Sequence, residues 1–567
     1  MSVSTHVYQA VLKGSPDRAL SLVGGSISLD ASRRPHVSGS ITIAVPSLAT
    51  LAALDPRMSP APRIVVTADA TFPWGTQTRS FNLGLRDRTV NLAAGTVTLP
   101  LASDEALLAD KGPLEDDITP LNYQASLRGL VGYVLDKVIP GATLAAGADV
   151  PVPALAESSN LIRNPRVAVG ITDWLTTWTS GGLTPTRQAS GGPSYAPTYL
   201  AVQASAATVG GYIYLSEASL AVTPGKLYEL SVDVGANAGI NVQVDAILYD
   251  AAGNIVNFAT PTAITPGASW KRIATTFVAV GNTVKVRPRV FINGTMPASQ
   301  YVNVTAWRLS ESTGDRAADR LYFDGGFTDT AQYDYGWAQT AHASISTRKP
   351  LIASATPDAL TWRAGKDAMS FLSPLVQAAG LRLVCDEQRV WTLRSEGYDA
   401  GGALEVRHGV NLIDGSERIS RDDREWFDAA VVVYTWTDRN GIRQERTDYY
   451  ALSPSYTLLR RFEFSTPFPG PGFAEYAVRR AQGRGRQVTV KTVADWNAKA
   501  EQGITVVLEG APTQTGETSV VTFDFDTDEV TLTSRTIDTP PGAWVLLAAG
   551  QKWTDSPVGG SWIGEAV

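Results

Sequence analysis

Alternating apolar and polar residues run through the middle of the chain. Three stretches show this most clearly: residues 226–234 (KLYELSVDV), 240–250 (INVQVDAILYD) and 283–294 (TVKVRPRVFING). Successive side chains of a strand point to opposite faces, so each stretch places its apolar residues on one face. Six or more such strands without a convincing helix predict an antiparallel β-sandwich.

The beginning of the chain combines strands with short helices. Residues 26–45 alternate on both sides of a loop, which predicts two antiparallel strands, and residues 79–103 predict two or three more. Residues 103–110 (SDEALLAD) predict a short helix with Ser103 as its N-cap. A second helix is expected over 126–139. Its apolar face would comprise Leu127, Leu130, Val131, Val134, Leu135 and Val138.

The end of the chain mixes the same elements. Apolar residues at helical spacing lie between Ala368 and Ala379, but Pro374 interrupts them, so we expect that helix to begin with Ser373 as N-cap. An Asn440-Gly441 turn predicts a hairpin within 427–450. Further along, the patterns predict a helix and a strand in 473–496 and a last hairpin in 518–538.

These patterns divide the chain into three regions. We place the boundaries at residues 1–155, 156–349 and 350–567, with the Pro- and Ala-rich stretch PVPALAESS as the first join. The expected fold class is mainly β with a few short helices. Barrel-like and α+β domains would lie at both ends, and an antiparallel sandwich in the centre.

Composition excludes several classes of protein. Of the 567 residues, 44% are hydrophobic and 18% charged, which is typical of a folded protein. The formal net charge of −7 argues against nucleic-acid binding, which needs phosphate neutralisation. Cys385 is the sole cysteine, so neither an intramolecular disulfide nor a Cys-based zinc site can form. We also expect no signal peptide and no membrane span, and therefore assembly in the cytoplasm.

The two outer regions resemble the tail-tip hub family of minor tail proteins from long-tailed bacteriophages of the actinobacterial type. The resemblance rests on the order of several loose motifs, namely SLDASRRPHVSGSITIAVPS, LDPR, SDEALLAD, WRAGKDAMSFLSPLVQAAGLRLVCDEQRVWTLR, FDAAVVVYTWTDRNG and VTFDFDTDEVTLTSR. It implies a rigid homotrimeric hub that closes the tail tube. The implied partners are the distal tail protein, the tape-measure protein and other minor tail proteins.

The central region is similar to a jelly roll of the carbohydrate-binding-module kind. The matching pieces are NLIRNP from Asn160, then Gly170 and Trp174, the strand KLYELSVDV, and WKRIATTF from Trp270. The stretch that follows, residues 322–347, is similar to a segment found behind such modules in actinobacterial phage tail proteins. The resemblance implies a sugar-binding module inserted into the hub.

Sugar recognition needs flat aromatic faces for C–H surfaces, and polar groups for hydroxyls. We select Tyr212, Tyr214, Trp178, Arg287 and Arg289 as candidate glycan-binding residues. Tyr212 and Tyr214 share one face of their strand, and the two arginines alternate with valines and so point away from the core. Buried aromatic residues usually serve packing, and this is our interpretation of Trp174. Solvation is the simpler explanation for the arginines.

Signals for catalysis and metal binding are weak. The four histidines form no HExxH motif, and no nucleophile elbow or phosphate-binding loop occurs. The acidic stretch 421–428 (RDDREWFD) could supply a glycosidase pair, but its arginines favour a salt-bridged turn. We assign no catalytic residue, metal site or cofactor. Jelly rolls of this kind often carry a structural calcium, for which the candidate donors are Asn160, Asp173, Asp233 and Asp245.

One further basic stretch, Arg479 to Gln487, could touch DNA or the tape-measure protein. We favour a helix end at which arginines meet acids of a neighbouring subunit.

The expected function is therefore structural rather than enzymatic. The chain would form the hub at the tail tip of the virion and present its sandwich to host cell-surface carbohydrate. Two alternatives stay open. One is a cell-wall hydrolase with an appended binding module, and the other is a purely structural tail protein whose sandwich contacts other tail proteins.

Overall fold

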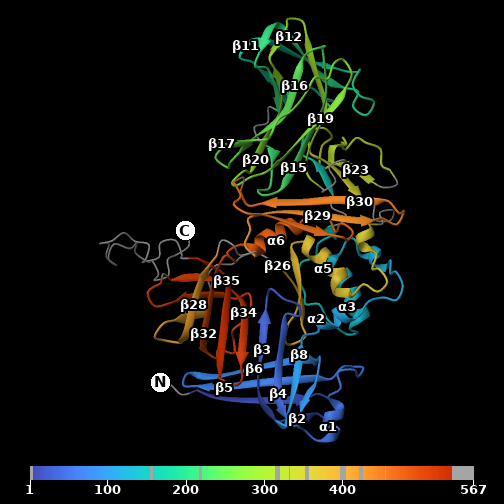
Figure 1. The fold of residues 1–567 in the computed structure, drawn as a ribbon. Helices are drawn as coiled ribbons and strands as arrows, with labels where there is room; N and C mark the ends of the chain where they lie inside the picture. Colours follow the sequence, from blue (N-terminus) through green and yellow to red (C-terminus); the bar gives the residue numbers. More distant parts are fainter. Residues whose placement is uncertain are drawn as a thin grey trace.

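The computed structural model describes residues 4–153, 157–215, 220–312, 319–330, 333–350, 357–395, 404–420, 425–453, 455–511 and 513–538. Strands dominate these residues and the helices are few and short, so the expected mainly-β fold with a central antiparallel sandwich is confirmed. The sandwich lies at one end of the molecule and the largest sheet at the other (Figure 1). None of the helices in the described residues is long and apolar enough to cross a membrane.

The largest sheet joins the two ends of the chain. Its 14 strands follow the order β2-β1-β5-β6-β8-β4-β3-β34-β35-β32-β28, with β7, β27 and β33 beside this path. The seam is the antiparallel pair β3–β34, from Ser26 opposite Asp524 to Asp30 opposite Val520. Residues from both ends therefore share one apolar core.

The strands of this sheet are β1 (Thr5–Leu12), β2 (Arg18–Leu20), β3 (Leu22–Asp30), β4 (Val37–Ala44), β5 (Arg63–Phe72), β6 (Gly75–Leu85), β7 (Thr89–Asn91), β8 (Thr96–Ala102), β27 (Leu404–Arg407), β28 (Leu412–Ile419), β32 (Arg486–Val493), β33 (Gly503–Val507), β34 (Gln514–Asp524) and β35 (Glu529–Asp538).

A second core forms around short helices. Its elements are α2 (Glu105–Asp110), η1 (Thr119–Tyr123), α3 (Leu127–Val138), η3 (Asp358–Leu360), α5 (Ala368–Ala378), β25 (Leu381–Cys385) and β26 (Trp391–Ser395), while α1 (Leu48–Ala53) lies apart from it. The prediction for α3 is confirmed, since all six apolar residues of its expected face are buried.

Two predicted helix starts are wrong. Helix α5 begins at Ala368, because the Asp367 side chain accepts a hydrogen bond from the Ser370 amide, and Pro374 lies inside the helix. Burial of apolar side chains on both sides of Pro374 offsets the proline's cost of about 3 kcal/mol. Helix α2 has Asp104 as N-cap, because the Ser103 amide donates to the Val37 carbonyl and so still belongs to the strand pairing.

A third layer separates the sandwich from the large sheet. Strand β29 (Ala429–Thr437) pairs antiparallel with β30 (Arg443–Ala451) through the predicted turn, where Gly441 has a φ of +78°. It pairs in parallel with β31 (Leu459–Phe464), and helix α6 (Phe473–Ala481) packs against β29 and β30.

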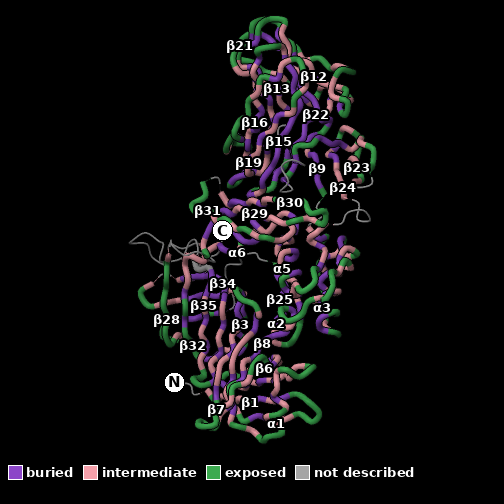
Figure 2. Tube along the Cα trace, turned by 45° about the vertical axis from the view of Figure 1, so that its right-hand side comes forward, coloured by how far each residue is buried: buried purple, intermediate pink, exposed green. Residues whose placement is uncertain are grey.

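The sandwich consists of two sheets over one core. One has the order β10-β13-β20-β16-β17 and includes β14 and β18; the other has the order β11-β12-β22-β15-β19 and includes β21. Buried residues follow β15 and β22 through its length (Figure 2). Trp174 and Trp307 stack in the core with 4.5 Å between ring centroids, as interpreted for Trp174.

The strands of the sandwich and its base are β9 (Ser158–Asn160), β10 (Trp174–Thr177), β11 (Ser180–Gln188), β12 (Tyr199–Val209), β13 (Tyr212–Leu215), β14 (Leu220–Ala221), β15 (Leu227–Ala236), β16 (Asn241–Tyr249), β17 (Ile255–Phe258), β18 (Thr262–Ile264), β19 (Lys271–Val278), β20 (Lys285–Asn293), β21 (Thr295–Met296), β22 (Tyr301–Glu311), β23 (Tyr333–Trp337) and β24 (Ser346–Pro350). Strand β24 pairs with both β9 and β23, so the two ends of the central region lie side by side.

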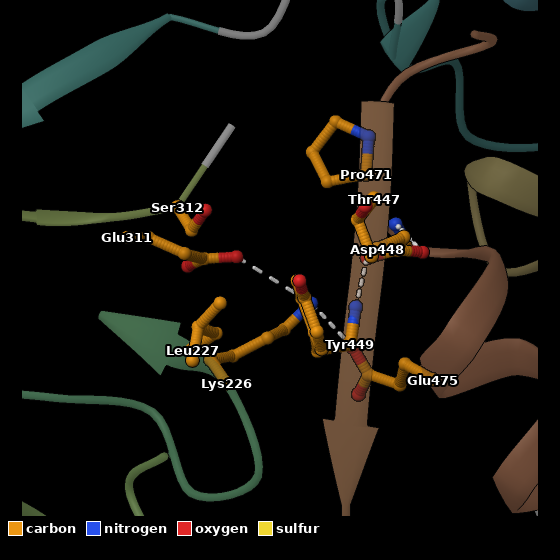
Figure 3. A pocket seen from close by; sticks show the side chains of 10 residues that line it. Lys226, Leu227, Glu311, Ser312, Thr447, Asp448, Tyr449, Pro471 and Glu475 are labelled. Carbon is orange, nitrogen blue, oxygen red and sulfur yellow. Dashed lines mark hydrogen bonds and ion pairs between the residues drawn. The ribbon is translucent and has the colours of Figure 1, made fainter. Parts of the chain in front are cut away.

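Lys226 connects the sandwich to the layer below it. Its Nζ lies 2.5 Å from Glu475 of α6 and 3.6 Å from Glu311 of β22 (Figure 3). Burial lowers the pKa of Lys226, but the two carboxylates outweigh burial and hold this pKa above its ordinary value, so Lys226 stays charged. Next to it, Gly225 has a φ of +83°, and a Cβ there would lie 2.4 Å from the Tyr450 ring. The two units therefore meet closely at this point.

Replacing Lys226 by methionine would leave Glu311 without its cation and Glu475 with Arg479 alone. We expect Lys226→Met to lower the free energy of unfolding by about 1–3 kcal/mol, because removing one partner of a partly buried ion pair leaves uncompensated charge. Chemical denaturation of the full chain measures this. The control is Lys271→Met, which removes an exposed lysine of β19 and should change stability by less than about 0.5 kcal/mol. Equal effects of the two variants would contradict the role of Lys226.

Candidate functional site

The two outer faces of the sandwich differ in exposure. On the β15 sheet, Glu229, Ser231 and Asp233 point away from the core, yet each is at most 1% exposed. Loops cover them: Asp233 bonds Tyr195 and Arg272, and Arg320 donates to Glu229. Over β15 and the end of β22 this outer face is therefore a buried polar layer that is closed to a ligand, whereas its part over β12, with Gln203 and Ser205, is exposed.

Tyr195 belongs to this cover. Its hydroxyl donates to an Asp233 carboxylate oxygen at 2.7 Å. Burial, together with this carboxylate, raises the pKa of Tyr195 to about 12, so the phenol stays neutral and keeps its proton for that bond. A ring fixed in this way serves structure rather than ligand binding.

The outer face of the other sheet is open along most of its width. The strand register places its residues in cross-strand rows: Thr177, Tyr212, Phe291 and Gln243 in one, and Leu175, Tyr214, Arg289 and Asp245 in the next. Two further rows contain Arg287, Ile247 and Phe258, and then Lys285, Tyr249 and Ile255. All of these side chains except Asp245 retain some exposure. We call the residues of these four rows the outer platform.

An ion pair fixes the middle of the outer platform. The Arg289 guanidinium donates to both carboxylate oxygens of Asp245, one of them at 2.8 Å, and Asp245 is only 3% exposed. Burial lowers the pKa of Arg289, but Asp245 outweighs burial and raises it, so the arginine is charged. The same guanidinium lies 5.1 Å from the Tyr212 ring centroid and 5.3 Å from that of Phe258. Arg289 therefore orients the aromatic rings around it.

Arg287 has a different environment. Its guanidinium carbon lies 5.6 Å from the ring centroids of both Tyr214 and Tyr249. Among the described residues it forms no hydrogen bond or ion pair, and its Nε is buried without a partner. The rings restrict the guanidinium, and its hydrogen-bonding capacity stays unused.

Four of the five predicted glycan-binding residues lie together. Tyr212, Tyr214, Arg287 and Arg289 all belong to the outer platform. Trp178 is 41% exposed and follows the last residue of β10, so it is not a member of the four rows. The solvated interpretation of the arginines is wrong, because both are half-buried and in contact with aromatic rings.

The sequence-based selection omitted several members of the outer platform. Phe291 lies against Tyr212 with 4.8 Å between ring centroids and a tilt of 37° between the rings, and Tyr249 and Phe258 complete the aromatic surface. Phe291 lies on the same face of β20 as Arg287 and Arg289, so the alternation in the sequence already indicated that its ring points outward. Pairing of β17 with β16, which brings Phe258 in, depends on tertiary structure.

The outer platform combines flat rings with polar groups, as binding of a saccharide requires. Ring faces contact sugar C–H surfaces, while Gln243, Arg287 and the tyrosine hydroxyls are available to sugar oxygens. In the described part of the chain, the hydroxyls of Tyr212, Tyr214 and Tyr249 carry no hydrogen bond. No group of this surface is arranged as an acid and base pair for catalysis.

The other candidate residues are engaged elsewhere. In the acidic stretch, residues 421–424, including Asp422 and Asp423, lie outside the described residues. Glu425 pairs with Arg484, and Asp428 accepts amide bonds from Thr457 and Leu458. Neither of these two carboxylates is left as a free catalytic group.

The basic stretch 479–487 meets acids of its own chain, and its expected contact with acids of a neighbouring subunit stays a prediction. The ion pairs are Arg479–Glu475, Arg480–Glu501, Arg484–Glu425 and Arg486–Glu417. The chain folds back so that β28 pairs with β32, which brings Glu417 and Glu425 close to these arginines.

The residues named for calcium have other partners. Asp233 and Asp245 are held by Arg272 and Arg289, and the Asn160 amide bonds backbone groups of the sandwich. Within the described ranges, no three His, Cys, Asp or Glu side chains lie close enough to hold a metal ion.

Comparisons with known proteins give partial similarities. No family model and no curated protein matches the chain. The 43 kDa tail protein of prophage MuSo2 from Shewanella oneidensis is similar over 94% of this chain and 100% of its own length, with a TM-score of 0.37 and 8% identity.

Two further structures match smaller parts. TmCBM61 in complex with beta-1,4-galactotriose covers 27% of this chain and 99% of its own, with a TM-score of 0.21 and 11% identity. The enzymatically active domain of tailspike protein 4 from bacteriophage CBA120 covers 26% of this chain, with a TM-score of 0.23 and 12% identity; this chain spans 21% of its length. At such TM-scores none of the three similarities carries an argument about what this chain does.

The two arginines should differ in their effect on stability. Arg289→Gln leaves the buried Asp245 carboxylate without its cation, so we expect a loss of about 2–4 kcal/mol in the free energy of unfolding. Arg287→Gln breaks no ion pair and should cost less than about 1 kcal/mol. Chemical denaturation of both full-length variants measures the difference. Equal losses would contradict the assigned ion pair.

Proposed function

We propose that this chain is a tail protein of a long-tailed bacteriophage that binds a host cell-surface glycan through the outer platform. The observation that carries the glycan part is the make-up of the outer face of the β20 sheet, which exposes five aromatic rings and a preorganised guanidinium. Such a surface matches the mixed apolar and polar character of a sugar.

The two outer regions would form the tail-tip hub of the virion. The order of the hub-like sequence motifs supports this, and so does one sheet shared by both ends of the chain, because a scaffold must close around an inserted unit. A homotrimeric hub would meet the distal tail protein and the tape-measure protein on one side and would present its sandwiches to the cell.

In such an assembly each single site can be weak. Several copies held on one rigid hub engage a cell surface together, which raises avidity by about 10²–10⁴ without new contacts. The proposed role is non-enzymatic, with attachment rather than cleavage as the function of the sandwich.

Binding of the full-length protein to a panel of bacterial cells tests this role. We expect Tyr214→Ala, and more strongly the double variant with Tyr212→Ala, to reduce binding at least about tenfold, because each loses a ring that would contact sugar. Tyr301→Ala is the matched control: it removes a half-buried tyrosine from the β22 strand of the other sheet. Fluorescence-detected cell binding by folded variants gives the readout.

Undiminished binding by the double variant would exclude the outer platform as the attachment site. It would favour a sandwich that contacts other tail proteins. Release of reducing sugar from cell walls by the wild type would instead favour the hydrolase alternative.

A further inference from the structure

We propose that the outer platform is built for an anionic saccharide and that Arg287 takes its carboxylate or phosphate group. This inference rests on the proposed function, since it specifies the ligand class of the same surface.

The two arginines of the platform are not equivalent in charge. The Arg289 charge is already balanced by Asp245, with two donor groups directed at the two carboxylate oxygens. Arg287 has no such counterpart among the described residues. A guanidinium that is not needed to hold the fold is available for a ligand.

The environment of Arg287 lowers the cost of binding an anion. The rings of Tyr214 and Tyr249, each 5.6 Å away, restrict the guanidinium before any ligand arrives, so little side-chain entropy remains to be lost. Its buried Nε lacks a hydrogen-bond partner, and a buried donor without a partner costs free energy. The two Nη groups are not buried and carry no hydrogen bond among the described residues, so a carboxylate or phosphate can accept hydrogen bonds from this end of the planar guanidinium.

The charge of the surroundings favours the same ligand class. Arg287, Arg289 and Lys285 are cationic, and Asp245 is the one carboxylate of the outer platform, so this surface is positive although the chain carries a net charge of −7. Another nearby carboxylate, Asp250, lies in the β16–β17 turn, where Asn254 donates to it. Anions are therefore attracted to this surface in particular, although the net negative charge of the molecule repels them elsewhere.

Tyrosine hydroxyls complete the site. Those of Tyr214 and Tyr249 flank Arg287 and carry no hydrogen bond in the described part of the chain, so they can donate to sugar oxygens beside the anionic group. Recognition would thus combine one charge-assisted contact with ring stacking, which separates an acidic sugar from a neutral one of the same shape.

Three immobilised polymers test the ligand class: polygalacturonate for carboxylates, poly(glycerol phosphate) for phosphates, and fully methyl-esterified polygalacturonate as the neutral match for the first. We expect full-length protein to bind at least one of the two acidic polymers at least about tenfold more tightly than the ester, as measured by biolayer interferometry. The polymer that binds distinguishes a uronic acid from a phosphate-bearing glycan.

Arg287→Gln should remove this preference, with a loss of about tenfold or more on the acidic polymer. Arg287→Lys should restore only part of it, because an ammonium keeps the charge but lacks the planar fork. One control should bind as the wild type does: Lys271→Gln, which removes an exposed positive charge outside the outer platform.

Equal binding to the ester and the acidic polymers would overturn the inference, as would unchanged binding by Arg287→Gln. So would no binding to either acidic polymer by a protein that binds cells through Tyr214. Each of these results leaves glycan attachment itself in place, whereas attachment fails only if the tyrosine variants bind cells as the wild type does.

Discussion

The ion pair between Lys226 and the carboxylates of Glu311 and Glu475 is the constraint on which the arrangement of the molecule depends. It connects a sandwich strand to helix α6 in the layer below (Figure 3). Close packing of Gly225 against Tyr450 leaves little room for the two units to shift. A binding surface gains from this rigidity, because a fixed orientation lowers the entropy lost when several copies bind at once.

The sandwich uses its two outer faces for different purposes. One face is covered over β15 and the end of β22 and is filled there with paired charges around Asp233 and Glu229, so this part serves as interior. The other is left open, and its central ion pair, Arg289 with Asp245, holds the aromatic rings in place rather than closing the surface. In the proposed function the open sheet would recognise the ligand, and its buried ion pair would keep the binding surface fixed.

Sequence periodicity was sufficient to predict the strands of the sandwich and which side of each strand faces out. It placed Tyr212, Tyr214, Arg287 and Arg289 outward, because alternation fixes the face once the core residues are known. It could not reveal that Asp245 lies opposite Arg289 or that Phe258 joins the surface, since strand pairing is set by tertiary contacts. Local rules also failed at Pro374, where burial of neighbouring apolar residues outweighs proline's preference for a helix start.

The most direct measurement of the central claim is hydroxyl-radical footprinting of the full-length protein with and without cell wall from a strain that it binds. Oxidation of half-exposed aromatic side chains reports their contact with a ligand. Attachment through the outer platform predicts that cell wall protects Tyr212, Tyr214, Tyr249, Phe258 and Phe291, while Trp74 of the distant large sheet, 72% exposed, is oxidised as before. Protection confined to the large sheet, with those five rings unchanged, would contradict the account.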